Sequence, residues 1–201
     1  MIRNIVFDIG NVLVAFRWRE YFAEFGYSKE IYDRLAKATA MSPVWHEYDR
    51  GVLTEEELLQ RFIANDPELE PQIRETLSNV DGLLRLYDYA VDWVKELKAK
   101  GYGVYYLSNY SWPALRDCSK ELEFLPYMDG GILSFMEKVI KPDAAIYHLL
   151  MNRYGLKAEE CVFLDDSPKN IDGAHAVGMH GIVFESKEQA IEELRKLGVN
   201  A

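Results

Sequence analysis

The amino-acid sequence predicts an α/β fold in which a doubly wound parallel sheet carries an inserted all-helical cap. Two observations support this prediction. Short apolar runs without strict alternation recur along the chain with helical patterns between them, which is typical of strands that are covered on both faces. Directly after the first of these runs, the stretch 16–80 contains helical patterns only, which breaks the strand–helix rhythm.

Four apolar runs are expected to form the buried strands. Each is short, rich in β-branched or aromatic residues and flanked by glycine or polar residues. They are IRNIVFD (2–8), GVYYLSN (103–109), CVFLDD (161–166) and GIVF (181–184). The segment 130–143 contains a further short β-like piece after Gly130 and Gly131, and we expect it to form a simple connection.

Helical patterns separate these runs in the second half of the chain. Each shows a proline or serine start signal, a glycine stop signal, or both. They are DYAVDWVKELKAKG (88–101), PDAAIYHLLMNRYG (142–155) and SPKNIDGAHAVG (167–178). Strands and helices that alternate in this way predict a parallel sheet with helices on both faces.

The stretch 16–80 reads as one helix after another. Its helical segments are WREYFAEFG (18–26), SKEIYDRLAKATA (28–40), TEEELLQRFIAND (54–66) and ELEPQIRETLSN (68–79). Thr54 followed by Glu57 forms a capping box that starts the third of them. We therefore expect residues 16–80 to form a helical cap domain over the carboxyl ends of the strands, and residues 1–15 and 81–201 to form the core domain.

Composition limits the classes of partner. The chain has 201 residues and a net charge of −10, without a basic stretch that could displace counterions from nucleic acid. No apolar stretch approaches the length of a membrane span, and no signal peptide is expected. The two cysteines lie far apart in the sequence, which indicates neither a disulfide framework nor a zinc site. We expect a soluble cytoplasmic protein that is a monomer or a weak homodimer.

Polar residues stand where the predicted strands end. In an open α/β sheet, ligands bind beyond these carboxyl ends. The residues there are Asp8, Ser108, Asn109, Asp165 and Asp166, and Lys141 precedes the helix that begins at Pro142. A lone acid after a strand is commonly a turn or cap residue, but adjacent acids near a core are costly unless a cation or amide groups neutralise them. Asp8 could complete an oxygen-rich magnesium site with the adjacent acids.

This set of residues is suited to phosphoryl transfer. A carboxylate is a competent nucleophile toward phosphorus and forms an aspartyl-phosphate. A magnesium ion, a lysine and a small hydroxyl can take up the charge of the transferred phosphoryl group. The sequence therefore predicts a magnesium-dependent reaction on a small phosphorylated metabolite.

Four sequence pieces resemble the motifs of a known family. They are FDIGNVLV (7–14), LSN (107–109), KPD (141–143) and FLDDSPKNIDGA (163–174). Their order and spacing resemble those of haloacid-dehalogenase-superfamily (HAD) hydrolases of the phosphatase type, with a Rossmann-like core and a helical cap after the first motif. The resemblance covers essentially the whole chain.

The resemblance implies a role for each motif residue. It makes Asp8 the nucleophile and a metal ligand, and makes the carbonyl of Gly10 a metal ligand. Phosphate-binding roles fall to Ser108, Asn109 and Lys141, and Lys141 also contacts the nucleophile. The acid that binds magnesium is Asp166, with Asp165 beside it as a further candidate ligand.

One position departs from the family pattern. Most phosphatases of the superfamily have a second Asp two residues after the nucleophile, which gives a proton to the leaving group and later activates water. This chain has Gly10 there. The DxGNV pattern and the stretch 45–58 resemble the α-glucose-1-phosphate phosphatases, whose leaving group needs less help. His46 is then a candidate proton donor and Arg50 a candidate substrate contact, unless His46 is structural and Arg50 solvated.

Two other interpretations remain open. A 2-haloacid dehalogenase also lacks the second Asp, because halide needs no proton, but it uses no metal and has small polar residues where this chain has Asp165 and Asp166. A degenerate member could bind a phosphorylated ligand or a partner without catalysis, although a binder gains little from Asp8 and Lys141. Magnesium-dependent phosphate release separates these interpretations.

Overall fold

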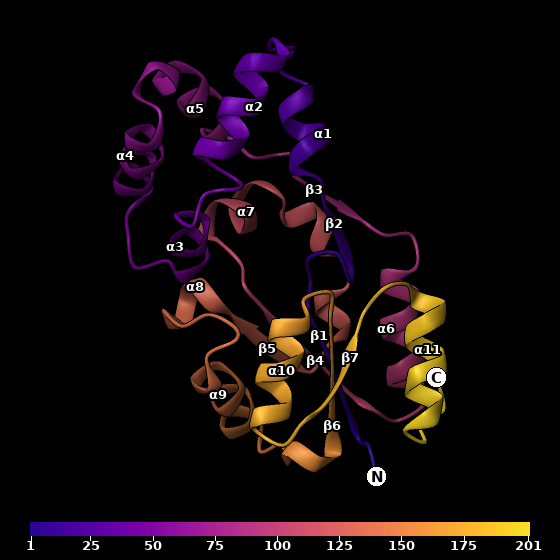
Figure 1. The fold of residues 1–201 in the computed structure, drawn as a ribbon. Helices are drawn as coiled ribbons and strands as arrows, with labels where there is room; N and C mark the ends of the chain where they lie inside the picture. Colours follow the sequence, from indigo (N-terminus) through magenta and orange to yellow (C-terminus); the bar gives the residue numbers. More distant parts are fainter.

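The computed structural model describes all 201 residues. Its centre is a five-stranded parallel sheet in the order β5-β4-β1-β6-β7 (Figure 1). The strands are β1 (Asn4–Phe7), β4 (Gly103–Ser108), β5 (Gly130–Leu133), β6 (Cys161–Asp165) and β7 (His180–Val183). The expected fold class is confirmed, and each of the four predicted runs overlaps a strand of this sheet.

β5 corrects one expectation, because residues 130–133 form an edge strand rather than part of a simple connection. A four-residue run with two glycines has a weak strand signal. The glycines are required by close packing: a Cβ at Gly131 would lie 2.3 Å from the carbonyl oxygen of Tyr106 on β4. The hydroxyl of Tyr154 also accepts a hydrogen bond from the Gly131 amide at 2.9 Å.

Helices cover both faces of the sheet. α6 (Ala90–Ala99) and α11 (Lys187–Lys196) pack on one face, and α9 (Ala144–Tyr154) and α10 (Pro168–Ala176) pack on the other (Figure 1). Alternate strand residues enter the two cores: Ile5 and Phe7 of β1 belong to the first, and Val6 belongs to the second. This three-layer arrangement directs the carboxyl ends of β1, β4 and β6 toward the remaining helices.

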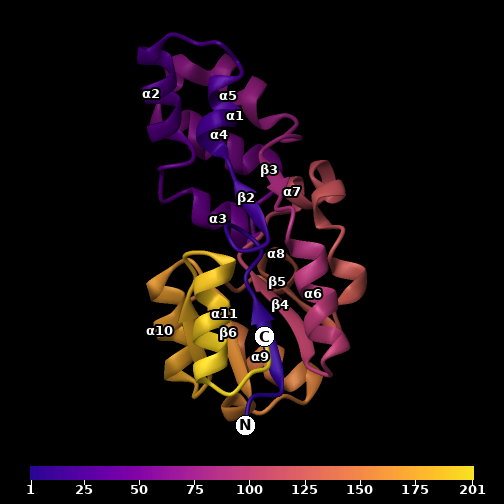
Figure 2. The same ribbon diagram turned by 90° about the vertical axis from the view of Figure 1, so that its right-hand side faces the viewer.

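Five helices lie between residues 17 and 83, after the first strand of the central sheet. They are α1 (Trp18–Ala23), α2 (Lys29–Ala38), α3 (Trp45–Arg50), α4 (Glu55–Asn65) and α5 (Glu70–Leu77). The capping box at Thr54 is confirmed, since its hydroxyl accepts from the Glu57 amide and the Glu57 carboxylate accepts from the Thr54 amide. The helices lie beyond the carboxyl ends of the strands, and both termini lie on the opposite, core side (Figures 1 and 2).

The two chain segments that join these helices to the sheet pair with each other. β2 (Val14–Phe16) and β3 (Leu84–Leu86) form an antiparallel ribbon in which Val14 is opposite Leu86 and Phe16 is opposite Leu84. Hydrogen bonds from the Arg17 amide to the Leu83 carbonyl and from the Tyr87 amide to the Leu13 carbonyl extend the ribbon at both ends. The sequence analysis did not anticipate this pairing.

The remaining elements are short. α7 (Trp112–Asp117) follows β4, and α8 (Ser134–Glu137) follows β5. Single 3-10 turns span Pro67–Leu69, Ser119–Leu122, Leu125–Tyr127 and Ala158–Glu160. None of the helices has the length and apolar character that crossing a membrane requires.

Candidate active site

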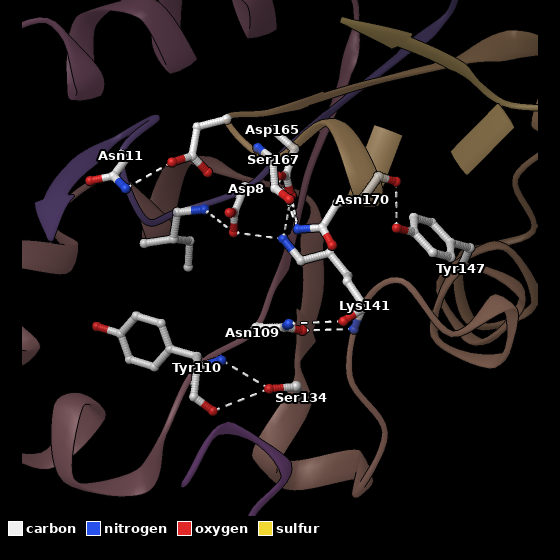
Figure 3. A network of polar contacts seen from close by, with 12 residues as sticks. Asp8, Asn11, Asn109, Tyr110, Ser134, Lys141, Tyr147, Asp165, Ser167 and Asn170 are labelled. Carbon is white, nitrogen blue, oxygen red and sulfur yellow. Dashed lines mark hydrogen bonds and ion pairs between the residues drawn. The ribbon is translucent and has the colours of Figure 1, made fainter. Parts of the chain in front are cut away.

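Lys141 joins two acids that come from different strands. Its ammonium Nζ lies 2.9 Å from Oδ1 of Asp8, which follows β1, and 2.6 Å from Oδ2 of Asp165, at the end of β6 (Figure 3). Lys141 is only 2% exposed and Asp165 is fully buried. A buried lysine is stable only when it is paired, so the two carboxylates hold its charge in place.

Neighbouring donors fix Asp165. Its Oδ1 accepts from the Ser167 amide at 2.8 Å, and both carboxylate oxygens accept from Nδ2 of Asn170 at 3.0 Å. The carbonyl of Asn170 accepts in turn from the Tyr147 hydroxyl at 2.6 Å (Figure 3). Both oxygens of Asp165 are therefore engaged within the protein, which suits it to orienting Lys141.

A residue of the loop after β1, Asn11, holds the side chain of Asp166. Nδ2 of Asn11 donates to Oδ2 of Asp166 at 2.8 Å, and Oδ1 of Asn11 accepts from the Phe16 amide at 3.1 Å. Asn11 has a φ of 56°, in the left-handed region that asparagine tolerates better than most residues. The turn at Asn11 thus brings the loop after β1 against the acid after β6.

The three acids form a set that suits a divalent cation. One carboxylate oxygen from each of Asp8, Asp165 and Asp166 lies within 4.8 Å of the others. Oxygen donors of this kind are the ligands of Mg²⁺. Oδ1 of Asp8 contacts the Ile9 amide and Lys141, and Asp8, Gly10 and Asp166 line one cavity. The residues therefore fit a magnesium ion.

The electrostatics also favour a cation. Burial raises the pKa of Asp8 to about 7, against the opposing effect of the Lys141 ammonium. Burial likewise raises the pKa of Asp166 above its ordinary value. Burial alone would lower the pKa of Lys141, but Asp8 and Asp165 together raise it, so the lysine stays charged. One ammonium faces three acids, and a bound cation would offset the remaining negative charge.

The residues that end β4 have different surroundings. The Ser108 hydroxyl is fully buried and makes no hydrogen bond of good geometry, although it is close enough to the Asp8 carboxyl to lower the pKa of that acid. The side chain of Asn109 bonds the backbone of Lys141 twice: Nδ2 donates to its carbonyl at 3.1 Å, and Oδ1 accepts from its amide at 2.8 Å. Asn109 thus fixes the segment that presents the lysine.

A cavity of about 230 Å³ opens beside these groups. Residues at the carboxyl ends of the sheet form one side of it: Asp8, Gly10, Asn11, Asn109 and Asp166. The segment after β4 adds Tyr110, Ser111 and Ala114, and the chain entering β3 adds Leu83 and Leu84. The helical insertion supplies Trp45, His46 and Asp49, and Phe16 adds to that wall. Ligand sites commonly enclose about 300–1,000 Å³, so this cavity favours a small ligand.

His46 and Arg50, the two candidate site residues from the cap, differ in their position relative to the cavity. His46 is exposed and lines the cavity. Arg50 does not line it; its Nε lies 3.4 Å from Oε1 of Glu47 on the outer side of α3. The aromatic residues Trp18 and Tyr21 are buried and also lie away from the cavity.

Sequence reasoning missed Asp49 and the contact that Asn11 makes. Asp49 is half-buried in the wall of the cavity, and burial raises its pKa to about 7, with Asp8 adding to the shift and Lys141 opposing it. Asp49 lies in the stretch 45–58, whose resemblance to the α-glucose-1-phosphate phosphatases suggested roles only for His46 and Arg50. Its one signal is a place three residues after His46, on the same face of a helix.

Comparisons with known proteins agree with this geometry. The family model of haloacid dehalogenase-like hydrolases matches residues 2–178. A flavin mononucleotide hydrolase of Arabidopsis thaliana is 26% identical over 163 residues, which are 78% of this chain and 63% of the plant protein. A sesquiterpene phosphatase of Aspergillus oryzae is 27% identical over 195 residues, which are 96% of this chain and 94% of the fungal protein.

A solved structure shares the fold. A HAD family enzyme of Bacteroides thetaiotaomicron, crystallised with magnesium and inorganic phosphate, superposes with a TM-score of 0.70 at 22% identity. The alignment covers 93% of this chain and 96% of that enzyme. At 22% identity, this match shows the fold of the chain and no more.

Proposed function

Because the chain belongs to the haloacid dehalogenase-like hydrolases, we propose that it is a magnesium-dependent phosphomonoester hydrolase that forms a phosphorylated Asp8. The observation that carries this proposal is the buried Lys141, whose ammonium contacts both Asp8 and Asp165 beside a third acid, Asp166. Two relatives in the comparison have names that denote removal of phosphate, which supports the same class of reaction.

The Asp8 carboxylate is suited to attack phosphorus. Oδ1 accepts from the Ile9 amide at 2.7 Å and lies 2.9 Å from Nζ of Lys141, so we assign the attack to Oδ2. Attack by Oδ2 forms the new P–O bond as the bond to the leaving oxygen breaks, and water then hydrolyses the phospho-Asp8. The Lys141 ammonium opposes the rise in the Asp8 pKa that burial causes, and it attracts the phosphoryl group.

Other residues would hold the phosphoryl group and the metal. The buried Ser108 hydroxyl can donate to a phosphoryl oxygen. We assign magnesium binding to Asp8, Asp166 and the Gly10 carbonyl, with Asp165 orienting Lys141 beside them. Magnesium, when bound, supplies positive charge that reduces the repulsion between these acids and a phosphate.

The cavity bears on the class of substrate. Its small volume and its apolar wall, which includes Phe16 and Trp45, favour a compact phosphorylated metabolite. The DxGNV pattern makes a sugar phosphate such as glucose 1-phosphate the first substrate to test. His46 is a candidate contact for the rest of the substrate. Arg50 lies outside the cavity wall, so a contact from Arg50 would require its ion pair with Glu47 to open.

Replacement of the nucleophile tests the proposal. The Asp8→Asn variant should lose magnesium-dependent phosphate release from p-nitrophenyl phosphate by at least about 1,000-fold, because an amide cannot form the phosphorylated intermediate. Asp92→Asn, which changes an exposed acid of α6, serves as the matched control and should retain activity.

Two results would contradict the proposal. Full activity of Asp8→Asn would exclude the nucleophile, and absence of phosphate release from a screen of sugar phosphates and aryl phosphates would exclude the phosphatase. Metal-independent release of fluoride from fluoroacetate would support a dehalogenase in its place.

A further inference from the structure

The proposed reaction lacks an obvious proton donor. An alkoxide leaving group needs a proton as its bond to phosphorus breaks. Gly10 has no side chain to give one. Among the other titratable groups that line the cavity, Asp8 and Asp166 are already assigned, and the Tyr110 hydroxyl is itself buried away from the open space. His46 and Asp49 remain, both on α3.

Asp49 sits on the face of α3 that forms the cavity wall. Trp45, His46 and Asp49 line the cavity, whereas Glu47 and Arg50 pair with each other outside it. Asp49 lies four residues after Trp45 and three after His46, so helical spacing brings these three side chains to one face. The Asp49 carboxyl has no hydrogen-bond or ion-pair partner within the protein, so it is free to meet a ligand.

The core holds the backbone of Asp49 in position. The Ser134 hydroxyl donates to the Asp49 carbonyl at 2.7 Å and accepts from the Tyr110 amide at 2.9 Å. Ser134 is fully buried and begins α8, and Figure 3 shows its contacts with Tyr110 in the loop after β4. It therefore ties α3 to that loop. Lys138 also donates to the carbonyl of Gly51, which ends α3. Asp49 is thereby fixed on the same cavity as Asp8.

We propose that Asp49 is the general acid and base of the reaction, in place of the side chain that Gly10 lacks. This inference rests on the proposed phosphatase function. In the first step Asp8 bonds to phosphorus, the bond from phosphorus to the substrate oxygen breaks, and protonated Asp49 gives its proton to that oxygen to release an alcohol. In the second step ionised Asp49 takes a proton from water as the water oxygen bonds to phosphorus, which frees phosphate and regenerates Asp8.

The surroundings of Asp49 suit both steps. Burial and the nearby Asp8 carboxylate raise its pKa to about 7, and Lys141 opposes the shift. Both protonation states are therefore accessible near neutral pH, as a group that acts first as acid and then as base requires. The charged groups on the adjoining α8 are engaged elsewhere: Lys138 bonds the Gly51 carbonyl, and Glu137 pairs with Arg153 at 2.8 Å.

The experiment compares leaving groups. For Asp49→Asn, kcat/KM is measured with p-nitrophenyl phosphate, whose leaving group needs no proton, and with the best alkyl phosphate found in a screen. Since kcat/KM reports the steps up to departure of the leaving group, we expect a value within about threefold of wild type for the aryl ester and a loss of about 100-fold or more for the alkyl ester.

A second readout does not depend on the leaving group. Phosphoenzyme trapped by acid quench should accumulate in Asp49→Asn with p-nitrophenyl phosphate, because water lacks its base. Asp49→Glu, which keeps a carboxyl group, should recover part of the rate on the alkyl ester. Asp92→Asn removes an exposed acid of α6 that does not line the cavity and serves as the matched control, with both rates unchanged.

Several outcomes would overturn the role of Asp49. Equal losses on both esters, no loss on the alkyl ester, or a wild-type enzyme that cleaves only aryl phosphates would each contradict it, while leaving the phosphatase intact. A loss confined to alkyl esters in His46→Gln and absent in Asp49→Asn would transfer the role to His46. A wild-type protein inactive on every phosphate ester would instead refute the proposed function itself.

Discussion

At the scale of single residues, the site contains more acid than its one lysine can neutralise. Asp8, Asp165 and Asp166 lie around Lys141, and Asp49 adds a fourth acid from the cap side. Burial raises the pKa values of Asp8 and Asp49 to about 7 each. Such crowding of acids reduces the stability of the folded protein and is typical of catalytic sites.

The titration of Asp49 predicts a pH-dependent stability. Its pKa is 3.8 ordinarily and about 7 in the folded protein, so its protonated form favours folding. That contribution is fully present below about pH 4 and is lost as the pH rises to about 7. Asp49→Asn cannot ionise. Without metal, its melting temperature relative to wild type should therefore increase from pH 4 to pH 8.

Thermal unfolding in EDTA, followed by circular dichroism at several pH values, measures this difference. Glu47→Gln is the control, since this acid lies outside the cavity. A difference between Asp49→Asn and wild type that stays constant across the pH range would show that Asp49 titrates normally in the folded state.

At the scale of elements, the packing of α3 against the core requires a glycine at its end. Gly51 ends this helix with a φ of 66°, and a Cβ there would lie 2.7 Å from Cβ and 2.8 Å from the carbonyl oxygen of Phe135 on α8. Gly155 ends α9 with a φ of 65° and has no atom within 4 Å of the same position. Alanine substitutions at the two glycines therefore separate the free-energy cost of a left-handed alanine from the cost of its contact with Phe135.

The comparison of these glycines gives a prediction. Gly155→Ala should destabilise the protein by about 1–2 kcal/mol, the cost of a left-handed alanine. Gly51→Ala should cost more, because α3 must also move away from Phe135. Its melting temperature should fall further, and cleavage of alkyl phosphates should decline as Asp49 is displaced. Equal shifts in melting temperature, measured by calorimetry, would contradict the close packing of α3 on α8.

The predictability of elements from the sequence depended on their length. The runs at 2–8, 103–109 and 161–166 carry enough β-branched and aromatic residues to indicate strands without a partner in view. β2 and β3 have three residues each, and their pairing requires segments that lie far apart in the sequence. The strand Gly130–Leu133 is specified by its contacts with Tyr106 and Tyr154, which no local pattern shows.

The same reasoning applies to the site. Asp8 and Asp165 could be predicted to meet because strand ends of a parallel sheet share one edge, and the family resemblance placed Lys141 beside Asp8; the structure brings the three together. The place of Asp49 depends on how α3 packs on Ser134 and Phe135, so a sequence motif could not reveal it. The roles that we assign to these residues in catalysis and metal binding are predictions, which the variants test.

At the scale of the whole molecule, the acid cluster should make stability depend on metal. An ion that binds only the folded state stabilises it by about 2.7 kcal/mol at 100 times its Kd, which corresponds to a rise in melting temperature of roughly 5–10 °C for a chain of this size. Magnesium should therefore raise the melting temperature, and EDTA should reverse the change and abolish phosphatase activity.

Replacement of Asp166 tests whether the acid cluster holds the magnesium ion that raises the melting temperature. Asp166→Ala should lose most of the thermal shift and require much more magnesium for activity, because its carboxylate belongs to the cluster. Asp172→Ala changes an exposed acid of the adjoining helix and should respond to magnesium like wild type. An undiminished thermal shift in Asp166→Ala, measured by calorimetry, would place the ion elsewhere.

The ribbon of β2 and β3 joins the two connections between the cap helices and the sheet. Because the two connections are hydrogen-bonded to each other, we expect any opening of the cap to bend both of them together. α3 has links of its own to the core, from Ser134 to the Asp49 carbonyl and from Lys138 to the Gly51 carbonyl. Water that entered an opened molecule would therefore still meet the Asp49 carboxylate beside the phosphorylated aspartate.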